Sequence, residues 1–244
     1  MKLKILSFNI HKGFNWSNTL LSIQHIKEAI HNTHSDIVFL QEVVGSNAIH
    51  EKNHDNWEQE QYKFLAEDKW NDFAYAKNAV YENRHHGNAI LSKYPITRFE
   101  QIDISTNKLE QRGVLFCEIQ LPDTLIHAYC VHLNLLKNDR KVQYEKLLEI
   151  IYSKTDKEIP IILAGDFNDW NKQASTFFEE HHFFESYKLI HGKYPKTFPV
   201  QFPLLSLDRI YLKRMKATSA KVLSKGDWKK LSDHAALFVE SKIE

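Results

Sequence analysis

The stretch from Ile159 to Asp169, IPIILAGDFND, carries the residues of this chain that are best placed to do chemistry. Its apolar run, 161–164, predicts a buried strand that Gly165 ends. A carboxylate, Asp166, and a carboxamide, Asn168, follow directly. In open α/β sheets, ligands bind beyond the carboxyl ends of strands. A carboxylate there can bind a hard cation or accept a proton from water, and an amide can orient an oxygen without adding charge.

Taken alone, this stretch is as consistent with a polar turn as with a catalytic centre, but other predicted strands carry matching residues. These are Asn9 after strand 2–8, Glu42 after 36–40, His132 after 125–131, Asp208 within 204–212, and Asp233 and His234 before 235–239. An acid inside an apolar strand is costly without a partner, so Asp208 requires one, and His234 is the candidate. A carboxylate on one imidazole nitrogen fixes the tautomer and raises the basicity of the ring.

The eight residues comprise four acids, two amides and two histidines. Oxygen ligands without cysteine favour Mg²⁺ or Mn²⁺ over zinc. Histidines beside such a metal suit phosphoryl transfer, because charge develops there on phosphate oxygens. We therefore predict a metal-dependent site for phosphate chemistry, with Asp169 outside its centre.

Two histidine-rich stretches have simpler interpretations. His50 and His54 stand in HEKNH, which matches the zinc-protease pattern HExxH, but the flanking residues lack the helical periodicity that this pattern needs. We interpret it as a chance match. His85 and His86 precede a predicted strand at 89–91, and neighbours on one strand point to opposite faces. We interpret them as a polar loop or a phosphate contact rather than a metal site.

The elements that must position these residues follow from local patterns. Helical spacing of apolar residues predicts a helix from an N-cap at Ser17 through Ile30, and another around 144–151. Within 45–83 we predict a helix over 58–70 and loop elsewhere. Arg112 and Gly113 open a strand at 114–119, and the aromatic stretches 177–187 and 194–203 are either core or surface loops.

Length and composition are typical of one domain, 1–244, because 43% of the 244 residues are hydrophobic and no linker or repeat is visible. The formal net charge of +1 disfavours tight non-specific binding to long duplex DNA. Cys117 and Cys130 lie in strand-like segments and are expected to be core thiols. The start is unlike a signal peptide, and no segment is long enough to cross a membrane. We expect a monomeric cytoplasmic protein.

Eight short stretches resemble, in order, the motifs of a known family. They are SFN (7–9), LQE (40–42), GN (87–88), RG (112–113), HLN (132–134), GDFN (165–168), LDRI (207–210) and SDH (232–234). The chain thus resembles the endonuclease/exonuclease/phosphatase superfamily, in a bacterial branch similar to deoxyribonucleases and sphingomyelinases. The resemblance implies an α/β fold, namely a four-layer sandwich of two stacked mixed β-sheets flanked by helices.

The resemblance also implies roles. Glu42 would hold the metal, helped by Asn9 and Asp233. Asp166, aided by Asn168, would position or deprotonate the attacking water.

The remaining roles concern the phosphate. His234, held by Asp208, would contact the scissile phosphate or act as the base. His132 would stabilise the phosphate or assist the leaving group, and apurinic endonucleases carry a tyrosine there, which disfavours abasic-site repair. Arg112 and Asn88 are further expected phosphate contacts.

Three functions compete. The first is a Mg²⁺-dependent phosphodiesterase acting on nucleic acid. The second applies the same chemistry to a phospholipid or sphingomyelin head group or to a small phosphate ester, which a membrane-surface loop would favour. The third is a non-catalytic binding module, which would have no need to keep every strand-end acid and both histidines. The sequence does not choose between the first two.

Overall fold

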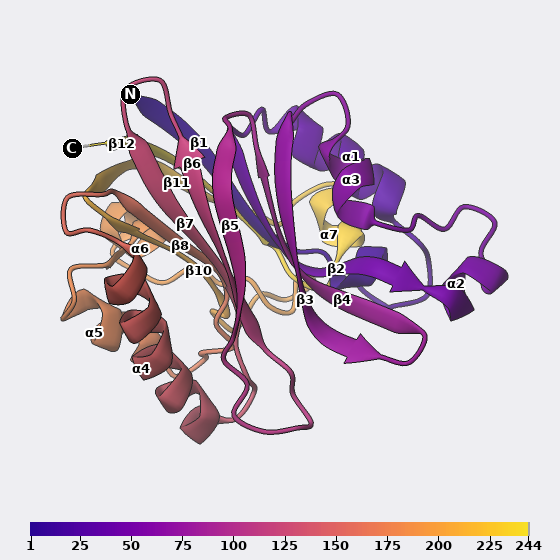
Figure 1. Cartoon of the computed structure of the whole chain (residues 1–244). Coiled ribbons are helices and arrows are strands. Elements are labelled where there is room, and N and C mark those ends of the chain that lie inside the picture. The colour runs from indigo at the N-terminus through magenta and orange to yellow at the C-terminus, as the bar shows by residue number, and fades with distance from the viewer. Residues whose placement is uncertain (244) are drawn as a thin grey trace.

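Two six-stranded β-sheets face each other in the computed structural model, which describes residues 1–243 (Figure 1). The first sheet contains, in spatial order, β11 (Met215–Leu223), β12 (Ala236–Ile243), β1 (Lys2–Asn9), β2 (Ile37–Asn47), β4 (Arg84–Ser92) and β3 (Asp72–Tyr81). The second contains β5 (Ile96–Asp103), β6 (Gly113–Gln120), β7 (Leu125–His132), β8 (Ile161–Asp166), β10 (Asp208–Lys213) and β9 (Phe184–Glu185). Both sheets are mixed, because β1 and β2 run parallel, as do β7 and β8, and their neighbours pair antiparallel.

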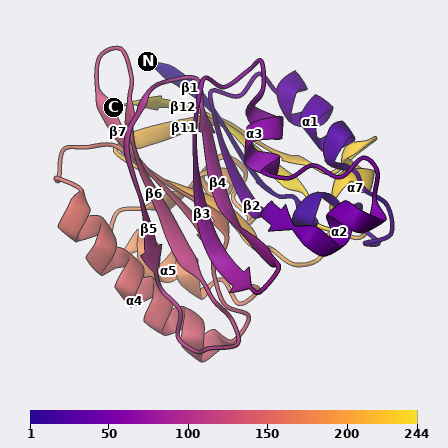
Figure 2. The same cartoon turned by 45° about the vertical axis from the view of Figure 1, so that its right-hand side comes forward.

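Helices cover the two outer faces. On the first sheet lie α1 (Ile23–Asn32), α3 (Gln61–Ala66) and α7 (Trp228–Leu231), and on the second lie α4 (Lys137–Lys154) and α5 (Gln173–Glu179). The short helices α2 (Ala48–Asn53) and α6 (Ser186–His191) and a 3-10 turn, η1 (His11–Gly13), complete the fold. Figures 1 and 2 show α4 on one side of the sheets and α1 and α3 on the other. The predicted four-layer α/β sandwich is confirmed.

Strand alternation explains how the sheets aim polar groups at one another. Side chains along a strand point alternately to its two faces. In β8, Ile162 and Ala164 pack between the sheets, whereas Ile161 and Leu163 face the helices. Asp166 continues the inward series, and the same two-residue step places three further polar side chains on the inner faces of β1, β7 and β10: Asn9, His132 and Asp208.

Several expected elements differ from the observed ones. The first helix begins at Ile23, so the Ser17 cap is wrong, and the helix expected over 58–70 spans only Gln61–Ala66. Residues 45–83 hold α2 and β3 as well as loop. The strand β3 forms because its more exposed side chains alternate with small buried ones such as Ala74 and Ala76. The strand ending in Gly165 continues to Asp166.

The aromatic stretch 177–187 mostly belongs to the core, since Phe178 and Phe183 are fully buried. Both cysteines are free and buried, as expected. Within residues 1–243, no helix combines the length and the apolar character needed to cross a membrane.

Candidate active site

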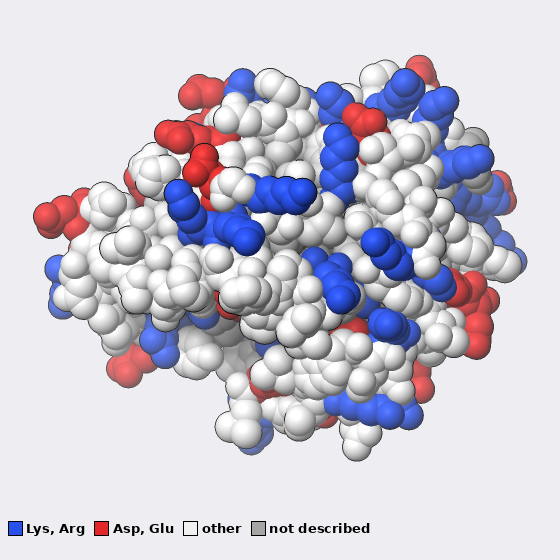
Figure 3. Space-filling view, turned by 180° about the vertical axis from the view of Figure 1, so that it is seen from behind, with Lys and Arg blue, Asp and Glu red and all other residues white. Residues whose placement is uncertain are grey.

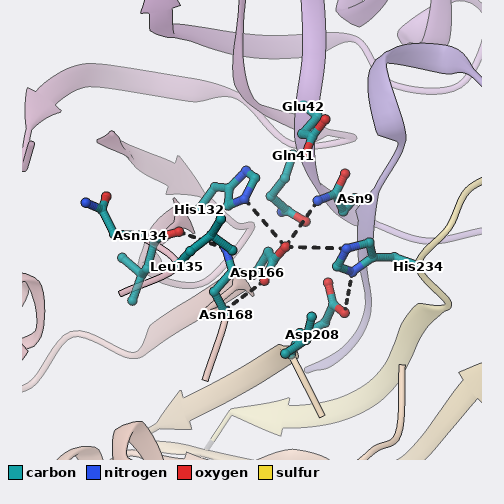
Figure 4. Close-up of polar contacts among 12 residues, drawn as sticks. Asn9, Gln41, Glu42, His132, Asn134, Leu135, Asp166, Asn168, Asp208 and His234 are labelled. Carbon is teal, nitrogen blue, oxygen red and sulfur yellow. Dashed lines mark hydrogen bonds and ion pairs between the residues drawn. The ribbon is translucent and has the colours of Figure 1, made fainter. Parts of the chain in front are cut away.

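The predicted polar residues converge at one end of the sandwich, where strands of both sheets finish or begin. Figure 4 shows Asp166 between the imidazoles of His132 and His234, with Asn9 reaching across from the first sheet. Oδ2 of Asp166 lies 3.2 Å from Nδ2 of Asn9, 3.5 Å from Nε2 of His132 and 3.7 Å from Nε2 of His234. The carboxylate of Asp166 is thus the centre of the cluster and is almost fully buried.

The backbone around Asp166 is shaped to present this carboxylate. Gly165 has φ +144°, and a Cβ there would lie 2.0 Å from the carbonyl oxygen of Val131, so only glycine allows β7 and β8 to approach at this point. Asn168 adopts a left-handed conformation with φ 49°. Its N–H donates to Oδ1 of Asp166 at 2.9 Å, and its Nδ2 donates to the carbonyl oxygen of Leu133. The turn therefore holds one carboxylate oxygen and leaves Oδ2 toward the histidines.

His234 and Asp208 form the second part of the cluster. Nδ1 of His234 lies 2.9 Å from Oδ2 of Asp208, which is fully buried at the start of β10. Burial alone would lower the pKa of His234, but the carboxylates of Asp208 and Asp166 raise it to about 10. Because Nδ1 is engaged, Nε2 is the nitrogen of His234 that faces the site.

The other ionisable groups of the cluster respond to the same burial. Burial raises the pKa of Asp166 to about 6, with His234 lowering it and Asp208 raising it further. Burial, reinforced by the positive charge of Arg112, holds the pKa of His132 well below its usual range. The cluster therefore combines a carboxylate, a neutral imidazole and an imidazolium within hydrogen-bonding or ion-pair range of one another.

Glu42 reaches the site through an irregularity in β2. The β2–β4 register shifts between Leu40 and Val43, and Glu42 has φ 55°. Such a bulge re-aims side chains that strict alternation would place elsewhere. The carboxylate of Glu42 contacts Nζ of Lys12 at 2.8 Å. Burial opposes ionisation of Glu42, but the positive charge of Lys12 holds its pKa well below its usual range.

The donor set fits a hard divalent cation. Oδ1 of Asp208 is buried without a hydrogen-bond donor, and Glu42 has only an ammonium beside it. One ligand atom each from Asp166, Asp208 and His234 lie within 4.8 Å of one another. Because His234 and Asp208 are already bonded to each other, the carboxylate of Glu42, which is ionised and has only the ammonium of Lys12 beside it, is the better candidate for a cation ligand.

A family model for the endonuclease/exonuclease/phosphatase family matches residues 6–234. The chain belongs to this family. Family members hydrolyse phosphoester bonds. An uncharacterized protein of Escherichia coli K12, YbhP, is 44% identical over 241 residues, covering 97% of this chain and 95% of YbhP.

Solved structures of the family share the fold at low sequence identity. An endonuclease/exonuclease/phosphatase from Beutenbergia cavernae superposes with a TM-score of 0.81 at 17% identity, over 99% of this chain and 72% of that one. D. rerio TDP2 complexed with single-strand DNA product gives 0.72 at 16%, over 99% of both chains. The mannosyl-6-phosphatase Bt3783 of Bacteroides thetaiotaomicron gives 0.74 at 18%, over 98% of this chain and 99% of that one.

Within this family fold, three expected site residues lie outside the Asp166 cluster. Asp233 is half-buried, and its Oδ1 lies 3.7 Å from Nδ1 of His11. Arg112 has a buried Nε without a partner and lines a cavity of about 640 Å³ that Glu42 also lines. Asn88 is fully buried.

The burial of Asn88 corrects its expected phosphate contact. Its Nδ2 donates to the carbonyl oxygens of Gly113 and Cys130 in the second sheet, and only its carbonyl oxygen lacks a partner. A phosphate offers acceptors and needs donors, so this side chain instead ties the two sheets together.

The sequence interpretation missed Lys12, and it expected loop at His50, which lies in α2, and before 89–91, where His85 and His86 lie in β4. Lys12 follows Asn9 by three residues, and that proximity to a strand end was the available signal. His85 and His86 lie within β4, where His85 meets the hydroxyl of Tyr75 and His86 lines the cavity beside Glu42.

The HExxH stretch begins in a real helix, α2, contrary to expectation. His50 and His54 nevertheless pack on Phe14 and Trp57 as part of an aromatic group. No acid or cysteine completes a metal-type cluster around them among residues 1–243. Their contacts are those of packed side chains.

Proposed function

We propose that this chain is a divalent-metal-dependent phosphodiester hydrolase. The observation that carries the proposal is the carboxylate of Asp166, buried and shared by two imidazoles and an amide at the end of the sandwich where Glu42 also lies. A carboxylate whose pKa is raised by burial, as that of Asp166 is, can accept a proton from water. A non-catalytic module has no physical need for such an arrangement.

The residues divide the work of an in-line displacement. Oδ2 of Asp166 takes a proton from a water molecule while the oxygen of that water bonds to phosphorus. The P–O bond on the opposite side of the phosphorus then breaks. Asn168 and Asn9 hold the Asp166 carboxylate in place through their hydrogen bonds. Mg²⁺ or Mn²⁺, held by Glu42 with Asn9 and Asp233, would supply positive charge for the phosphate oxygens.

The two histidines act on the phosphate in different ways. His234 is flanked by two carboxylates, so it is a cation whose Nε2 stabilises developing negative charge and is not free to act as the base. His132 is neutral and donates a hydrogen bond to a phosphate or leaving-group oxygen.

Nucleic acid is the first of the substrate classes considered from the sequence, and the complex of D. rerio TDP2 with single-strand DNA product supports it. The mannosyl-6-phosphatase shows the same fold in an enzyme for a small phosphate ester. A phospholipid head group is favoured by exposed apolar side chains and lysines on the loops around the site. All three substrate classes share the chemistry given above.

A substrate panel with Mg²⁺ and with EDTA tests the proposal. It covers plasmid, single-stranded DNA, phospholipid vesicles, a sugar phosphate and a simple aryl diester. We expect hydrolysis of at least one diester with Mg²⁺ or Mn²⁺, and none with EDTA. Hydrolysis that persists in the chelator, or activity restricted to monoesters, would contradict a metal-dependent phosphodiesterase.

A further inference from the structure

Exposed apolar side chains gather at the end of the second sheet that carries the Asp166 cluster. Four loops meet there: 104–112 before β6, 133–136 after β7, 167–172 after β8, and 197–207 before β10. These strands are adjacent in the order β6-β7-β8-β10. We name the following exposed side chains of these loops the apolar rim: Leu109, Leu135, Leu136, Trp170, Phe202 and Leu204.

Most side chains of the apolar rim are largely exposed to solvent. Leu109 is 92% exposed, Phe202 77%, Leu204 67% and Leu136 65%. Large apolar groups exposed together on one surface mark an interaction site.

Contacts between the loops make the rim one continuous feature. The carboxylate of Glu110 accepts a hydrogen bond from the N–H of Leu135, joining the first two loops. Arg140 donates to the carbonyl oxygens of residues 134 and 135, and its guanidinium lies 4.8 Å from the ring of Trp170. Trp170 and Leu204 line one surface hollow.

Each loop of the rim also supplies a lysine at or beside it. These exposed lysines are Lys108, Lys137, Lys172 and Lys196. The nearby acids point inward: Glu110 bonds to Leu135, and Asp169 is fully buried. The charge near the rim is therefore mainly positive. Figure 3, which views the molecule from behind, shows Lys and Arg also over the middle of the face drawn there, with Asp and Glu mainly toward its margins.

We propose that the apolar rim docks on the surface of an anionic phospholipid bilayer, so that the Asp166 cluster meets a phosphodiester head group there. Leucine, tryptophan and phenylalanine tips enter the boundary between head groups and acyl chains, and the lysines contact lipid phosphates. The inference names a substrate class for the proposed phosphodiesterase and rests on that function.

Two other kinds of binding partner, a protein and a nucleic-acid strand, fit the apolar rim less well. A protein partner seated on the rim would lie beside the catalytic cluster and obstruct its substrate, whereas a bilayer supplies the substrate itself. A nucleic-acid strand gains stacking from Trp170 and Phe202 but nothing from leucine tips.

Vesicle flotation tests the docking without relying on turnover. Wild-type protein in EDTA is mixed with vesicles of phosphatidylcholine and phosphatidylglycerol, or of phosphatidylcholine alone. We expect binding to the mixed vesicles and much weaker binding to the neutral ones, weakened further by salt. Leu109→Ser and Leu136→Ser should each lower the partition constant roughly tenfold, and Lys137→Gln roughly fivefold.

The controls are matched in type and exposure. Leu189→Ser removes a leucine that is 56% exposed on α6, and Lys157→Gln removes a lysine on the loop before β8, at the opposite end of the sheet. Both should bind vesicles as wild type does. Circular dichroism confirms that every variant is folded.

The outcomes separate this inference from the proposed function. Absence of vesicle binding, binding that the rim variants share with the controls, or rim-dependent binding of a single-stranded oligonucleotide instead of vesicles overturns the docking. Hydrolysis of a soluble diester would still stand in those cases. Rim-dependent vesicle binding with no hydrolysis of any diester would retain the docking and remove the proposed function.

Discussion

The two halves of the candidate site are built differently. The half on the second sheet, with Asp166 and Asp208 at its centre, is buried and connected by hydrogen bonds to backbone, amide and imidazole groups. The half on the first sheet carries Glu42 on a bulge with positive φ, and its carboxylate contacts the partly exposed Lys12.

This difference separates two physical tasks. Groups that move protons need fixed geometry, and the hydrogen bonds around Asp166 and Asp208 provide it without any ligand. A cation site must admit an ion from solvent, and the ionised carboxylate of Glu42 is partly exposed and lines the cavity of about 640 Å³. Variants in each half should therefore fail in different ways.

Asp166→Asn should have the largest effect. The substitution keeps size but removes the basic oxygen, so kcat should fall by ~10²–10⁴, while binding of substrate largely survives. Steady-state kinetics on one soluble diester measures this. Asn168→Ala should also lower kcat, but by less, because it loosens the turn that holds Asp166. Wild-type turnover by Asp166→Asn would show that the base lies elsewhere.

Asp208→Asn should come next. The amide cannot hold His234 as a cation, and loss of such an orienting partner typically costs about 10–100-fold in activity. The readout is kcat together with the imidazole pKa of His234 by NMR, which should fall from its raised value. A variant with unchanged pKa and turnover would contradict the assigned role of the pair.

Lys12→Gln should change metal dependence more than turnover. If the ammonium competes with the cation for Glu42, removing it should lower the Mg²⁺ concentration for half-maximal activity by about two- to fivefold, as expected for a partly exposed ion pair. Lys63→Gln, which breaks the exposed pair with Glu60, is the matched control. A higher Mg²⁺ requirement in Lys12→Gln would contradict competition.

Asp169→Ala should affect stability and not chemistry. Asp169 is fully buried, and its Oδ2 accepts the N–H of Ala174 at 2.8 Å at the start of α5. Leaving that donor unpaired should lower the free energy of unfolding by about 1–3 kcal/mol in urea titrations. Asp227→Ala, at an exposed acid, is the control. Turnover per folded molecule as low as that of Asp166→Asn would place Asp169 in the site.

Prediction from sequence was most successful where a residue has few stable arrangements when it is buried. Asp208 in an apolar strand needs a partner, and His234 lies 2.9 Å from it. Prediction was poorest where the backbone departs from regular alternation. Glu42 was expected just past a strand, but β2 continues to Asn47 through a bulge. Asn88 was expected to contact phosphate from the family resemblance, and its hydrogen bonds to residues 25 and 42 positions away in the facing sheet leave no local pattern in the sequence.

The sequence by itself determined which side chains of a strand share a face, because a two-residue period is a local property of the chain. It also determined, through eight motifs in order, the family to which the chain belongs. Only the tertiary structure decided which strand ends meet. Asn9 and Asp166 are 157 positions apart and bond only because two sheets stack. The contact of Lys12 with Glu42 and the gathering of the apolar rim have the same origin, since packing, not local pattern, brings separate loops to one end of the sandwich.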